Sequence, residues 1–366
     1  MKFQIQREDL LIPLQKIIGA VEKKQTMPIL SNVRVKADTQ SLVLTATDLE
    51  IELLTNLQLA VDEPGETTLP ARKLLDICKA LPGECVISIS VKSDKASLQS
   101  GRSRFSLATL PASDFPVLDT INSVAEFDIP HNILKELIDN TAFAMAQQDV
   151  RYYLNGLLLE VGNDRLRAVA TDGHRLACCE KEADCELTEI KQVILPRKGV
   201  HELVRLLDES EESVHLTLGT NHLRANIGEY QFTSKLIDGR FPDYNRVIPD
   251  DGNNVMTADR ETLRQALVRA SILSNEKYRG IRLIFEDNLL RLQTQNPDQE
   301  EAEVEVEVNY KGERLEIGFN VNYMLDVLNT TAFDTVQATL RDSNSSCLLT
   351  YPDQKNCKYV IMPMRL

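Results

Sequence analysis

Apolar and polar residues follow two patterns along the 366 residues of the chain. Short runs of period two, as in 29–53, 153–177 and 279–303, predict a strand, a turn, a second strand and a turn into a third. Other segments carry apolar residues three and four positions apart, which is typical of amphipathic helices. Together the patterns predict an α+β protein with antiparallel sheets.

Helices are predicted at 8–24, 72–80, 131–146, 197–207, 260–279 and 320–329. LPARKLLDICKAL at 69–81 and LPRKGVHELVRLL at 195–207 both begin with Leu-Pro and basic residues, and FNVNYMLDVLN at 319–329 is a weaker copy. Leu10, Leu134 and Leu263 fall at equivalent places in the remaining helical segments. The helices therefore form two sets of three related copies.

The patterns recur at an interval of about 125 residues, which is longer than the period of solenoid repeats. Such an interval fits three domains of one fold, at residues 1–125, 126–250 and 251–366. Each domain is expected to contain two helices and about eight short strands.

The segment VATDGHRLACC at 169–179 raises three interpretations. Asp172 and His174 could form part of a catalytic triad, and His174 with Cys178 and Cys179 could begin a zinc site. The related segment VLTATDLEIEL at 43–53 repeats the Thr-Asp pair, however, so a repeated Asx-type turn explains the pair without catalysis.

The seven cysteines are odd in number and contain no C-x-x-C pair, which favours reduced thiols over a disulfide framework. No histidine has a partner at helical spacing, and HELVR at 201–205 ends in Arg205 where a zinc-binding helix needs a second histidine. Phosphate-binding, dinucleotide-binding and nucleophile-elbow motifs are also missing from the sequence. We therefore expect neither an enzyme nor a bound metal or cofactor.

A net charge of −14 argues against a nucleic-acid partner unless the charges are segregated. The predicted helices carry an excess of Lys and Arg, whereas the remaining segments are strongly acidic. A basic surface made of helices would bind phosphates without reading sequence. The chain has no Trp and only 5% aromatic residues, which disfavours single-strand stacking and favours duplex.

Charge also alternates in EEAEVEVEV at 300–308, where period two places the glutamates on one face of a strand. GRSRFSL at 101–107 supplies Arg102 and Arg104 in the first domain. A head-to-tail contact between the first and third domains would therefore be complementary in charge. The N-terminus lacks the apolar core of a signal peptide and no run reaches spanning length, so we expect a cytoplasmic protein away from membranes.

The repeats, the basic helices and the C-terminal sequence together resemble one family along the full length of the chain. The matching segments are LPARKLLDIC, GRSRFSLATLPASDFP, QDVRYYLNG, ATDGHRLA, PRKGV, FTSKLIDGRFPDY, ILSNEKYRG, NPDQEEAE, IGFNVNYMLDVLN and YVIMPMRL. They are similar to the bacterial sliding clamp, the beta subunit of DNA polymerase III.

This resemblance implies three tandem clamp domains that close, as a homodimer, into a head-to-tail ring. Helices would line a hole around duplex DNA, and an ATP-driven loader would open the ring. A peptide-binding groove would recruit the polymerase III core, the clamp loader and other replication or repair proteins through short motifs. The chain would act as a processivity factor.

The resemblance also assigns site residues. One part of the groove takes Leu154, Thr171, Gly173, His174, Arg175, Leu176, Pro242, Val247, Val360 and Met362, and the adjoining part takes Arg151, Tyr153, Tyr323, Asn344, Ser346, Pro363, Met364 and Arg365. DNA contacts fall on Lys24, Arg72, Gln148, Tyr152, Tyr153, Arg197 and Lys198. The dimer interface takes Lys73, Ile77, Leu81, Arg102, Arg104, Phe105 and Leu107 against Ile272, Leu273, Glu300, Glu301 and Glu303.

Two positions depart from the family pattern. Asn344 is polar where a small apolar residue is common, and Lys24 replaces an arginine, which keeps the charge but loses a two-pronged phosphate contact. Two other functions stay open from the residues alone. One is a repeat-built protein scaffold that never touches DNA, and the other is a hydrolase centred on Asp172 and His174.

Overall fold

The computed structural model describes the chain except for residues 23–26, 119–120, 163, 184, 186, 188, 250–251, 332 and 366. Lys24, predicted to contact DNA, lies outside the described residues. The chain divides into two compact parts. The first part contains residues 1–135 and 198–236, and the second contains 136–197 and 237–366.

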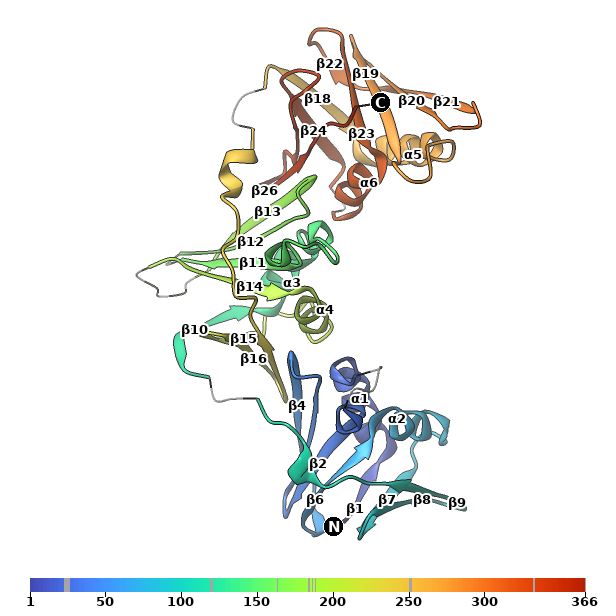
Figure 1. Cartoon of the computed structure of the whole chain (residues 1–366), viewed down its shortest axis with the longest axis vertical. Coiled ribbons are helices and arrows are strands. Elements are labelled where there is room, and N and C mark those ends of the chain that lie inside the picture. Colours follow the sequence, from blue (N-terminus) through green and yellow to red (C-terminus); the bar gives the residue numbers. More distant parts are fainter. Residues whose placement is uncertain are drawn as a thin grey trace. The chain divides into compact units, whose positions relative to one another are not determined.

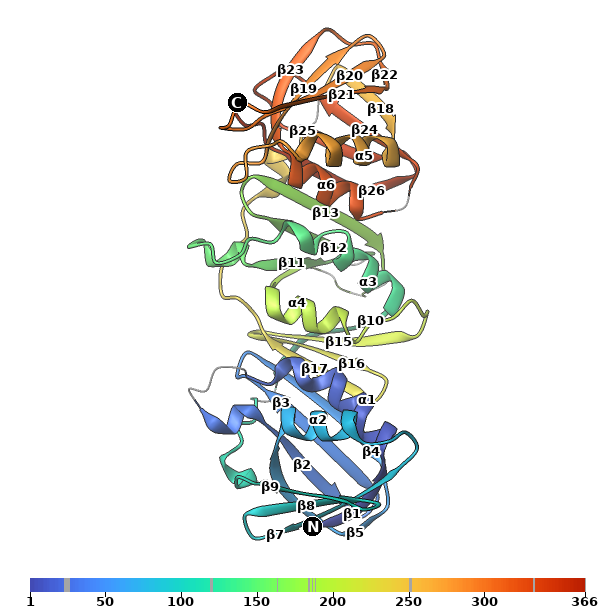
Figure 2. The same cartoon turned by 90° about the vertical axis from the view of Figure 1, so that its right-hand side faces the viewer.

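Two antiparallel sheets build the first part (Figure 1). The five-stranded sheet has the order β5 (Val61–Glu63), β1 (Lys2–Gln6), β7 (Val86–Lys92), β8 (Lys95–Ser100), β9 (Ser103–Ala108). The eight-stranded sheet has the order β10 (Ser123–Pro130), β15 (Ser213–Gly219), β16 (His222–Ile227), β17 (Tyr230–Lys235), β4 (Ile51–Gln58), β3 (Ser41–Thr47), β2 (Asn32–Asp38), β6 (Gly65–Pro70). Helix α1 (Arg7–Ile17) lies beside α2 (Ala71–Ala80), as Figure 2 shows.

The second part also contains two antiparallel sheets. The nine-stranded sheet has the order β14 (Lys191–Pro196), β11 (Gly156–Val161), β12 (Arg165–Thr171), β13 (Arg175–Glu182), β26 (Gln354–Ile361), β25 (Cys347–Tyr351), β24 (Thr335–Leu340), β18 (Asn254–Asp259), β22 (Asn309–Tyr310). The four-stranded sheet has the order β21 (Glu301–Glu307), β20 (Leu289–Gln295), β19 (Gly280–Glu286), β23 (Leu315–Asn320). Helix α5 (Arg260–Ser271) lies beside α6 (Val321–Asn329). Helices α3 (His131–Asp139) and α4 (Arg197–Val204) each cross the division between the parts.

Each large sheet is joined by strands from distant segments. In the first part β4 pairs with β17, from Ile51↔Ser234 to Thr55↔Tyr230. In the second part β13 pairs with β26, from Arg175↔Ile361 to Cys179↔Cys357. We call these pairings the first and second ladder. Each ladder covers a strand edge that would otherwise expose unpaired backbone groups.

The predicted strand, turn, strand pattern is confirmed in all three copies, as β2–β3–β4, β11–β12–β13 and β19–β20–β21. Leu10, Leu134 and Leu263 are at most 1% exposed, so the equivalent helical positions all face the core. The described helices are neither long nor apolar enough for any of them to cross a membrane.

Several helices end earlier than the apolar pattern predicts. The segment 260–279 is helical only to Ser271, because the Ser271 hydroxyl donates to the Val268 carbonyl at 2.8 Å and Ser274 donates to the Ser271 carbonyl at 2.7 Å. Side-chain hydrogen bonds of this kind compete with continuation of the helix. At its start, Asp259 caps α5 by accepting from the Thr262 N–H at 2.7 Å.

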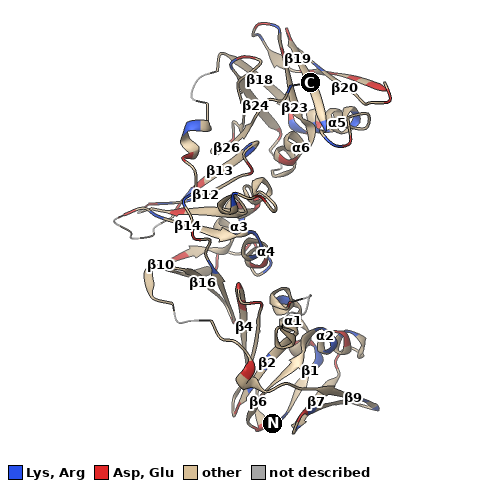
Figure 3. Cartoon of the chain, viewed as in Figure 1, with Lys and Arg blue, Asp and Glu red and all other residues tan. Residues whose placement is uncertain are grey.

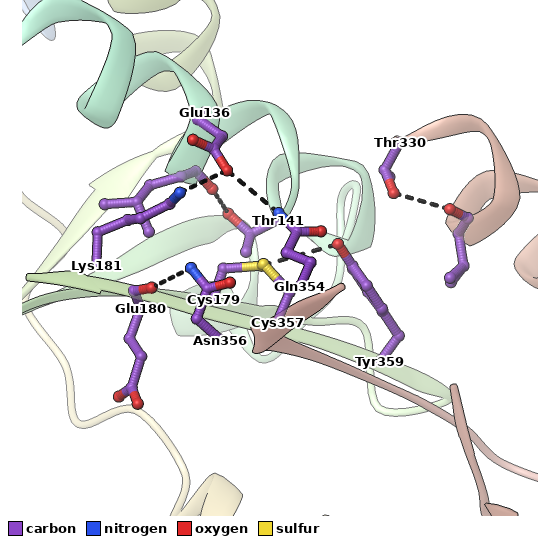
Figure 4. The surroundings of a disulfide bond; sticks show 12 residues. Glu136, Thr141, Cys179, Glu180, Lys181, Thr330, Gln354, Asn356, Cys357 and Tyr359 are labelled. Carbon is purple, nitrogen blue, oxygen red and sulfur yellow. Dashed lines mark hydrogen bonds and ion pairs between the residues drawn. A yellow bond between two sulfur atoms is a disulfide. The ribbon is translucent and has the colours of Figure 1, made fainter. Parts of the chain in front are cut away.

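The prediction that all cysteines are reduced thiols is wrong for two of them. Cys179 on β13 and Cys357 on β26 form a disulfide, with their Cα atoms 4.1 Å apart (Figure 4). The two residues lie 178 positions apart, and only the register of the second ladder places them opposite each other. Cys178, the neighbour of Cys179, remains a buried free thiol, as expected.

Candidate functional site

The turn between β12 and β13 is held by its own Thr-Asp pair. Thr171 Oγ1 accepts from the Gly173 N–H at 3.1 Å and donates to the Arg175 carbonyl at 2.6 Å. Asp172 Oδ1 accepts from the N–H groups of His174 and Arg175 at 2.9 and 3.0 Å. The predicted Asx turn is therefore confirmed.

The turn between β3 and β4 repeats this geometry. Asp48 Oδ1 accepts from the N–H groups of Glu50 and Ile51 at 2.9 and 2.8 Å, and Thr47 donates to the Ile51 carbonyl at 2.7 Å. The two turns differ at their left-handed position, which is Leu49 in one (φ 76°) and Gly173 in the other (φ 86°). Leu49 packs its side chain against an apolar cluster of Ile29, Leu30 and Phe115. In the second turn the Arg151 guanidinium lies beside Gly173, 2.9 Å from where a Cβ would stand.

A cavity of about 170 Å³ lies beside Gly173. It is lined by Arg151, Leu154, Thr171, Gly173, Arg175, Leu176, Pro242, Asp243, Tyr244, Val247, Val360 and Met362. Every residue predicted for the first part of the groove is in this lining except His174. A Cβ at Gly173 would meet the Arg151 guanidinium at 2.9 Å, so glycine both adopts the left-handed turn conformation and lets Arg151 lie against the turn.

The floor of the cavity belongs to a packed apolar cluster. Leu154, Leu176 and Val360 are each at most 3% exposed and pack with Val169 and Phe241. Leu176 and Val360 are register partners in the second ladder. Met362 follows β26 and is 38% exposed at the rim, which leaves a flexible, polarisable side chain free to adjust to an occupant.

Arg175 is bound inside the protein. Its guanidinium donates to Asp172 Oδ2 at 3.2 Å and to the Phe143 carbonyl at 2.8 Å, and it forms an ion pair with Asp326 on α6. The rings of Phe143 and Tyr323 lie 5.3 and 4.5 Å from the guanidinium carbon. Arg175 therefore fastens α6 to the β12–β13 turn.

A second polar network holds Tyr244, which is one of the residues that line the cavity. Arg167 on β12 donates to the Tyr244 hydroxyl at 2.7 Å and to Glu160 at 3.0 Å, and it pairs with Glu180 at 2.5 Å. Tyr244 also donates to Glu160 at 3.2 Å. Burial raises the pKa of the Tyr244 phenol to about 12, so it stays a proton donor at neutral pH. The segment Tyr244–Val247 is thereby held over the sheet.

The adjoining part of the predicted groove is spread over separate surfaces. Tyr323 and His174 line a polar cavity of about 380 Å³ with Asp149, Asp172 and Arg197. Hydrogen bonds from Arg151 lower the pKa of Asp149 to about 2. Met364 and Arg365 line another cavity, of about 570 Å³, beside β19, β20 and β21.

The remaining predicted groove residues are Tyr153, two residues of the loop before β25, and Pro363. Tyr153 packs against the apolar cluster of the cavity floor. The Asn344 N–H donates to Asp342 Oδ1 at 2.9 Å in the loop before β25, which also carries Ser346. Pro363 follows β26, and the Met364 N–H donates to the Gly318 carbonyl at 2.8 Å.

The predicted DNA-contacting residues differ in how free their charges are. Arg72 is exposed on α2. Lys198 forms an ion pair with the buried Asp48 carboxylate, and Arg197 donates to the Met145 carbonyl at 3.1 Å, so these two cations are partly engaged. Tyr152 is 57% exposed and lies edge-on to Tyr153, while Gln148 is exposed with φ 56°.

The predicted dimer residues lie on two sheet edges. β9 carries Arg104, Phe105 and Leu107 at the edge of the five-stranded sheet, with Arg102 in the turn before it and Lys73, Ile77 and Leu81 on or just after α2. β21 carries Glu301 and Glu303 at the edge of the four-stranded sheet, and Figure 3 shows its acidic colouring. Glu300 is exposed just before β21, and Ile272, just after α5, is 74% exposed beside the half-buried Leu273.

Asp172 and His174 do not form a catalytic pair. The Asp172 carboxylate is occupied by the turn and by Arg175, and His174 is exposed beside it. Among the described residues no group of three or more His, Cys, Asp or Glu could hold a metal ion.

The sequence matches family models of the DNA polymerase III beta subunit along nearly its whole length. The N-terminal, central and C-terminal domain models match residues 1–119, 128–243 and 245–365. The chain belongs to this family. The hydrolase interpretation is therefore set aside, and the chain consists of three tandem clamp domains.

Members of the beta subunit family resemble the chain closely. It is 54% identical to the beta sliding clamp of Pseudomonas aeruginosa and 48% identical to that of Escherichia coli K12, with complete coverage of both chains in each case. The crystal structure of the DNA polymerase III subunit beta from Pseudomonas aeruginosa superposes with a TM-score of 0.97 at 54% identity, again with complete coverage.

The sequence prediction missed Asp243 and Tyr244 in the cavity wall and Phe143 and Asp326 around Arg175. Asp243 and Tyr244 adjoin Pro242, so the quoted segment RFPDY contained a local signal for them. Asp326 sits 151 positions from Arg175, and no local signal connects the two.

Arg175→Met should destabilise the protein by about 2–3 kcal/mol, because the Asp172 and Asp326 carboxylates and the Phe143 carbonyl each lose the guanidinium as a donor. Asp326→Asn keeps the shape of α6 and should cost about half as much. Urea unfolding followed by circular dichroism measures both changes. Arg246→Met removes an ion pair with Asp243 in which the Arg246 side chain is 84% exposed. The free energy of unfolding of this variant should stay within about 0.5 kcal/mol of that of the wild type. Equal losses for all three variants would contradict the fastening role of Arg175.

Proposed function

We propose that the chain is a DNA sliding clamp that closes as a head-to-tail homodimeric ring around duplex DNA. The full-length match to beta sliding clamps at 54% identity carries this proposal. The ring tethers the replicative polymerase III core to its template and so makes synthesis processive. As a processivity factor it has no catalytic step of its own.

Retention on DNA would come from topology and not from tight binding. The basic groups assigned to the DNA-facing surface include Arg72, Arg197 and Lys198, and two of them are already engaged within the protein. Few free cations give weak, sequence-independent contacts with phosphates. Weak contacts allow sliding, while a closed ring prevents escape.

Ring closure would join β9 of one chain to β21 of its partner. Both strands are edges with unpaired backbone groups, and edges of this kind readily pair with another chain. Arg102 and Arg104 would face the glutamates of β21, which fixes a head-to-tail arrangement. The exposed Ile272 side chain would become buried in the contact.

The cavity beside Gly173 would receive an apolar side chain of a partner peptide. Leu154, Leu176, Val247, Val360 and Met362 supply apolar walls, while Thr171 and Arg151 offer polar groups at the rim. Short motifs of the polymerase III core, the clamp loader and other replication or repair proteins are the proposed occupants. Opening the ring for loading would fall to the separate loader.

The decisive experiment compares circular and linear DNA. Labelled protein, loaded by a clamp loader onto nicked circular plasmid, should stay bound through gel filtration and should be released when a restriction enzyme linearises the plasmid. Release follows because a ring has no barrier at a free DNA end. Equal retention on both forms would refute the clamp.

Charge removal separates the clamp from a scaffold that never touches DNA. The combined Arg72→Ala, Arg197→Ala and Lys198→Ala variant should lose loading and processive synthesis by about tenfold or more, since each phosphate contact contributes to affinity. Lys79→Ala, Lys92→Ala and Lys95→Ala combined, at exposed positions outside the assigned set, serve as the charge-matched control. Unchanged synthesis in the triple variant would favour the scaffold.

Ile272→Ala with Leu273→Ala should weaken the dimer by roughly 2–4 kcal/mol per ring interface, because apolar burial is lost at both side chains. Sedimentation velocity at nanomolar to micromolar protein should show monomer where wild type is dimeric. Val268→Ala, at an exposed apolar position on α5, is the control. A dimer of unaltered affinity would remove Ile272 and Leu273 from the interface.

Val247→Asp should weaken binding of a short peptide from the polymerase III core at least tenfold, because the carboxylate must be desolvated in an apolar wall. Val255→Asp, on β18, tests a valine of similar exposure, 41% against 38%, outside the cavity lining. Calorimetric titration measures both. If the two variants bind the peptide equally well, this cavity is not the peptide site.

A further inference from the structure

The second ladder, in which β13 pairs with β26, carries the cavity floor at one end and the disulfide at the other. At one end, Leu176 and Val360 are register partners on the cavity floor. At the other end, the last register pair is Cys179 and Cys357, whose sulfurs are bonded. The bond joins the central clamp domain to the last strand of the C-terminal domain. Any change at this bond therefore acts on the strands that carry the cavity floor.

The strand ends around the sulfurs are held by other contacts as well, as Figure 4 shows. Asn356 Nδ2 donates to the Glu180 carbonyl at 2.6 Å. Glu136 on α3 pairs with Lys181 at 2.7 Å and accepts from Gln354 Nε2 at 3.2 Å. These contacts hold β26 against β13 without help from the sulfurs. The ladder can therefore stay paired while both cysteines are thiols.

The first ladder supports the same conclusion. It has the same number of register pairs, and Thr55 and Tyr230 occupy the end that corresponds to Cys179 and Cys357. That end is closed without sulfur. A covalent bond is thus an addition to this kind of junction and not a requirement for building it.

The other cysteines of the chain indicate the redox conditions under which the bond forms. Cys78, Cys85, Cys178 and Cys347 are free thiols. Cys178 is adjacent to Cys179, yet it faces the apolar cluster of the cavity floor because successive strand residues point to opposite faces. A protein that keeps several free thiols works in surroundings that reduce disulfides. In such surroundings a single bond forms only when oxidant is present.

We propose that Cys179 and Cys357 are a reversible thiol–disulfide modification site that locks the central clamp domain to the C-terminal clamp domain under oxidising conditions. The oxidant is a low-molecular-weight disulfide. One cysteine thiolate attacks it, forms a mixed disulfide and releases one small thiolate. The second cysteine thiolate attacks the mixed disulfide, forms the Cys179–Cys357 bond and releases the other. Two protein thiols become one disulfide, one small disulfide becomes two small thiols, and the two protons pass to them.

Access to the pair comes from its position. Both sulfurs are buried, at 1% and 0% exposure of the residues. They nevertheless belong to the last pair of the ladder, and local opening begins at the ends of paired strands. The Cys179–Cys357 bond forms when the ends of β13 and β26 pair again. The bond then prevents the next local opening of these strand ends.

The first experiment maps the bond. Full-length protein is equilibrated with graded ratios of reduced and oxidised glutathione, alkylated, and digested with trypsin without reduction. The oxidised sample should yield LACCEK (176–181) joined to NCK (356–358), and excess dithiol should return both as free thiols under native conditions. Cys178→Ser should retain a joined peptide, whereas Cys179→Ser and Cys357→Ser should lose it.

A joined peptide that persists in Cys179→Ser, or that never forms at any glutathione ratio, would overturn the assignment. Resistance to native dithiol would overturn its reversibility. These outcomes leave the clamp proposal untouched, because retention on circular DNA is measured separately.

The second experiment tests the lock. Hydrogen exchange followed by mass spectrometry should show amides at 176–178 and 358–360 exchanging at least tenfold more slowly in the disulfide form than in the dithiol form. Amides of β3, in the first part, should exchange equally in both. The same exchange rate in both redox forms would mean that the bond does not lock the ladder.

Discussion

Pairing of strands from different repeats is the constraint on which the other features depend. A single clamp repeat leaves strand edges with unsatisfied backbone donors and acceptors, and the first and second ladders cover two of these edges. The second ladder sets Leu176 beside Val360 in the cavity floor and brings Cys179 to Cys357. The ion pair between Arg175 and Asp326 supports the same junction from the helical side. The cavity floor, the disulfide and the position of the Arg175–Asp326 ion pair thus all depend on the register of the second ladder.

Features that depend on local sequence were predictable. The Thr-Asp pair encodes a turn whose hydrogen bonds span only four residues, so the Thr171–Arg175 geometry followed from the sequence and from its copy at Thr47–Ile51. The equivalence of Leu10, Leu134 and Leu263 followed from the repeat. The cavity lining around Gly173 and Leu176 was predicted through family resemblance, because its residues come from four separate segments.

Features that depend on distant register were not predictable. Nothing near Cys179 indicates that Cys357 lies opposite, and nothing near Arg175 indicates Asp326. Lys198 reads as a free cation in sequence, yet it pairs with Asp48, which is 150 positions away. The helix at 260–279 was overextended because an apolar pattern continues past the point where serine hydroxyls capture the carbonyls. In each case the deciding partner is supplied by tertiary structure or by a competing hydrogen bond.

Leu49 and Gly173 occupy the same position in two copies of one turn, and under the proposed function this difference sets the number of partner sites on the chain. The leucine side chain packs against an apolar cluster, whereas the glycine has the Arg151 guanidinium beside it and lines a cavity. A chain built from repeats could have carried several equivalent docking points, but in the proposed function the duplicated turn supplies one, at Gly173. In the proposed two-chain ring, partner proteins would therefore compete for two binding sites. One partner would have to leave a site before another could bind there.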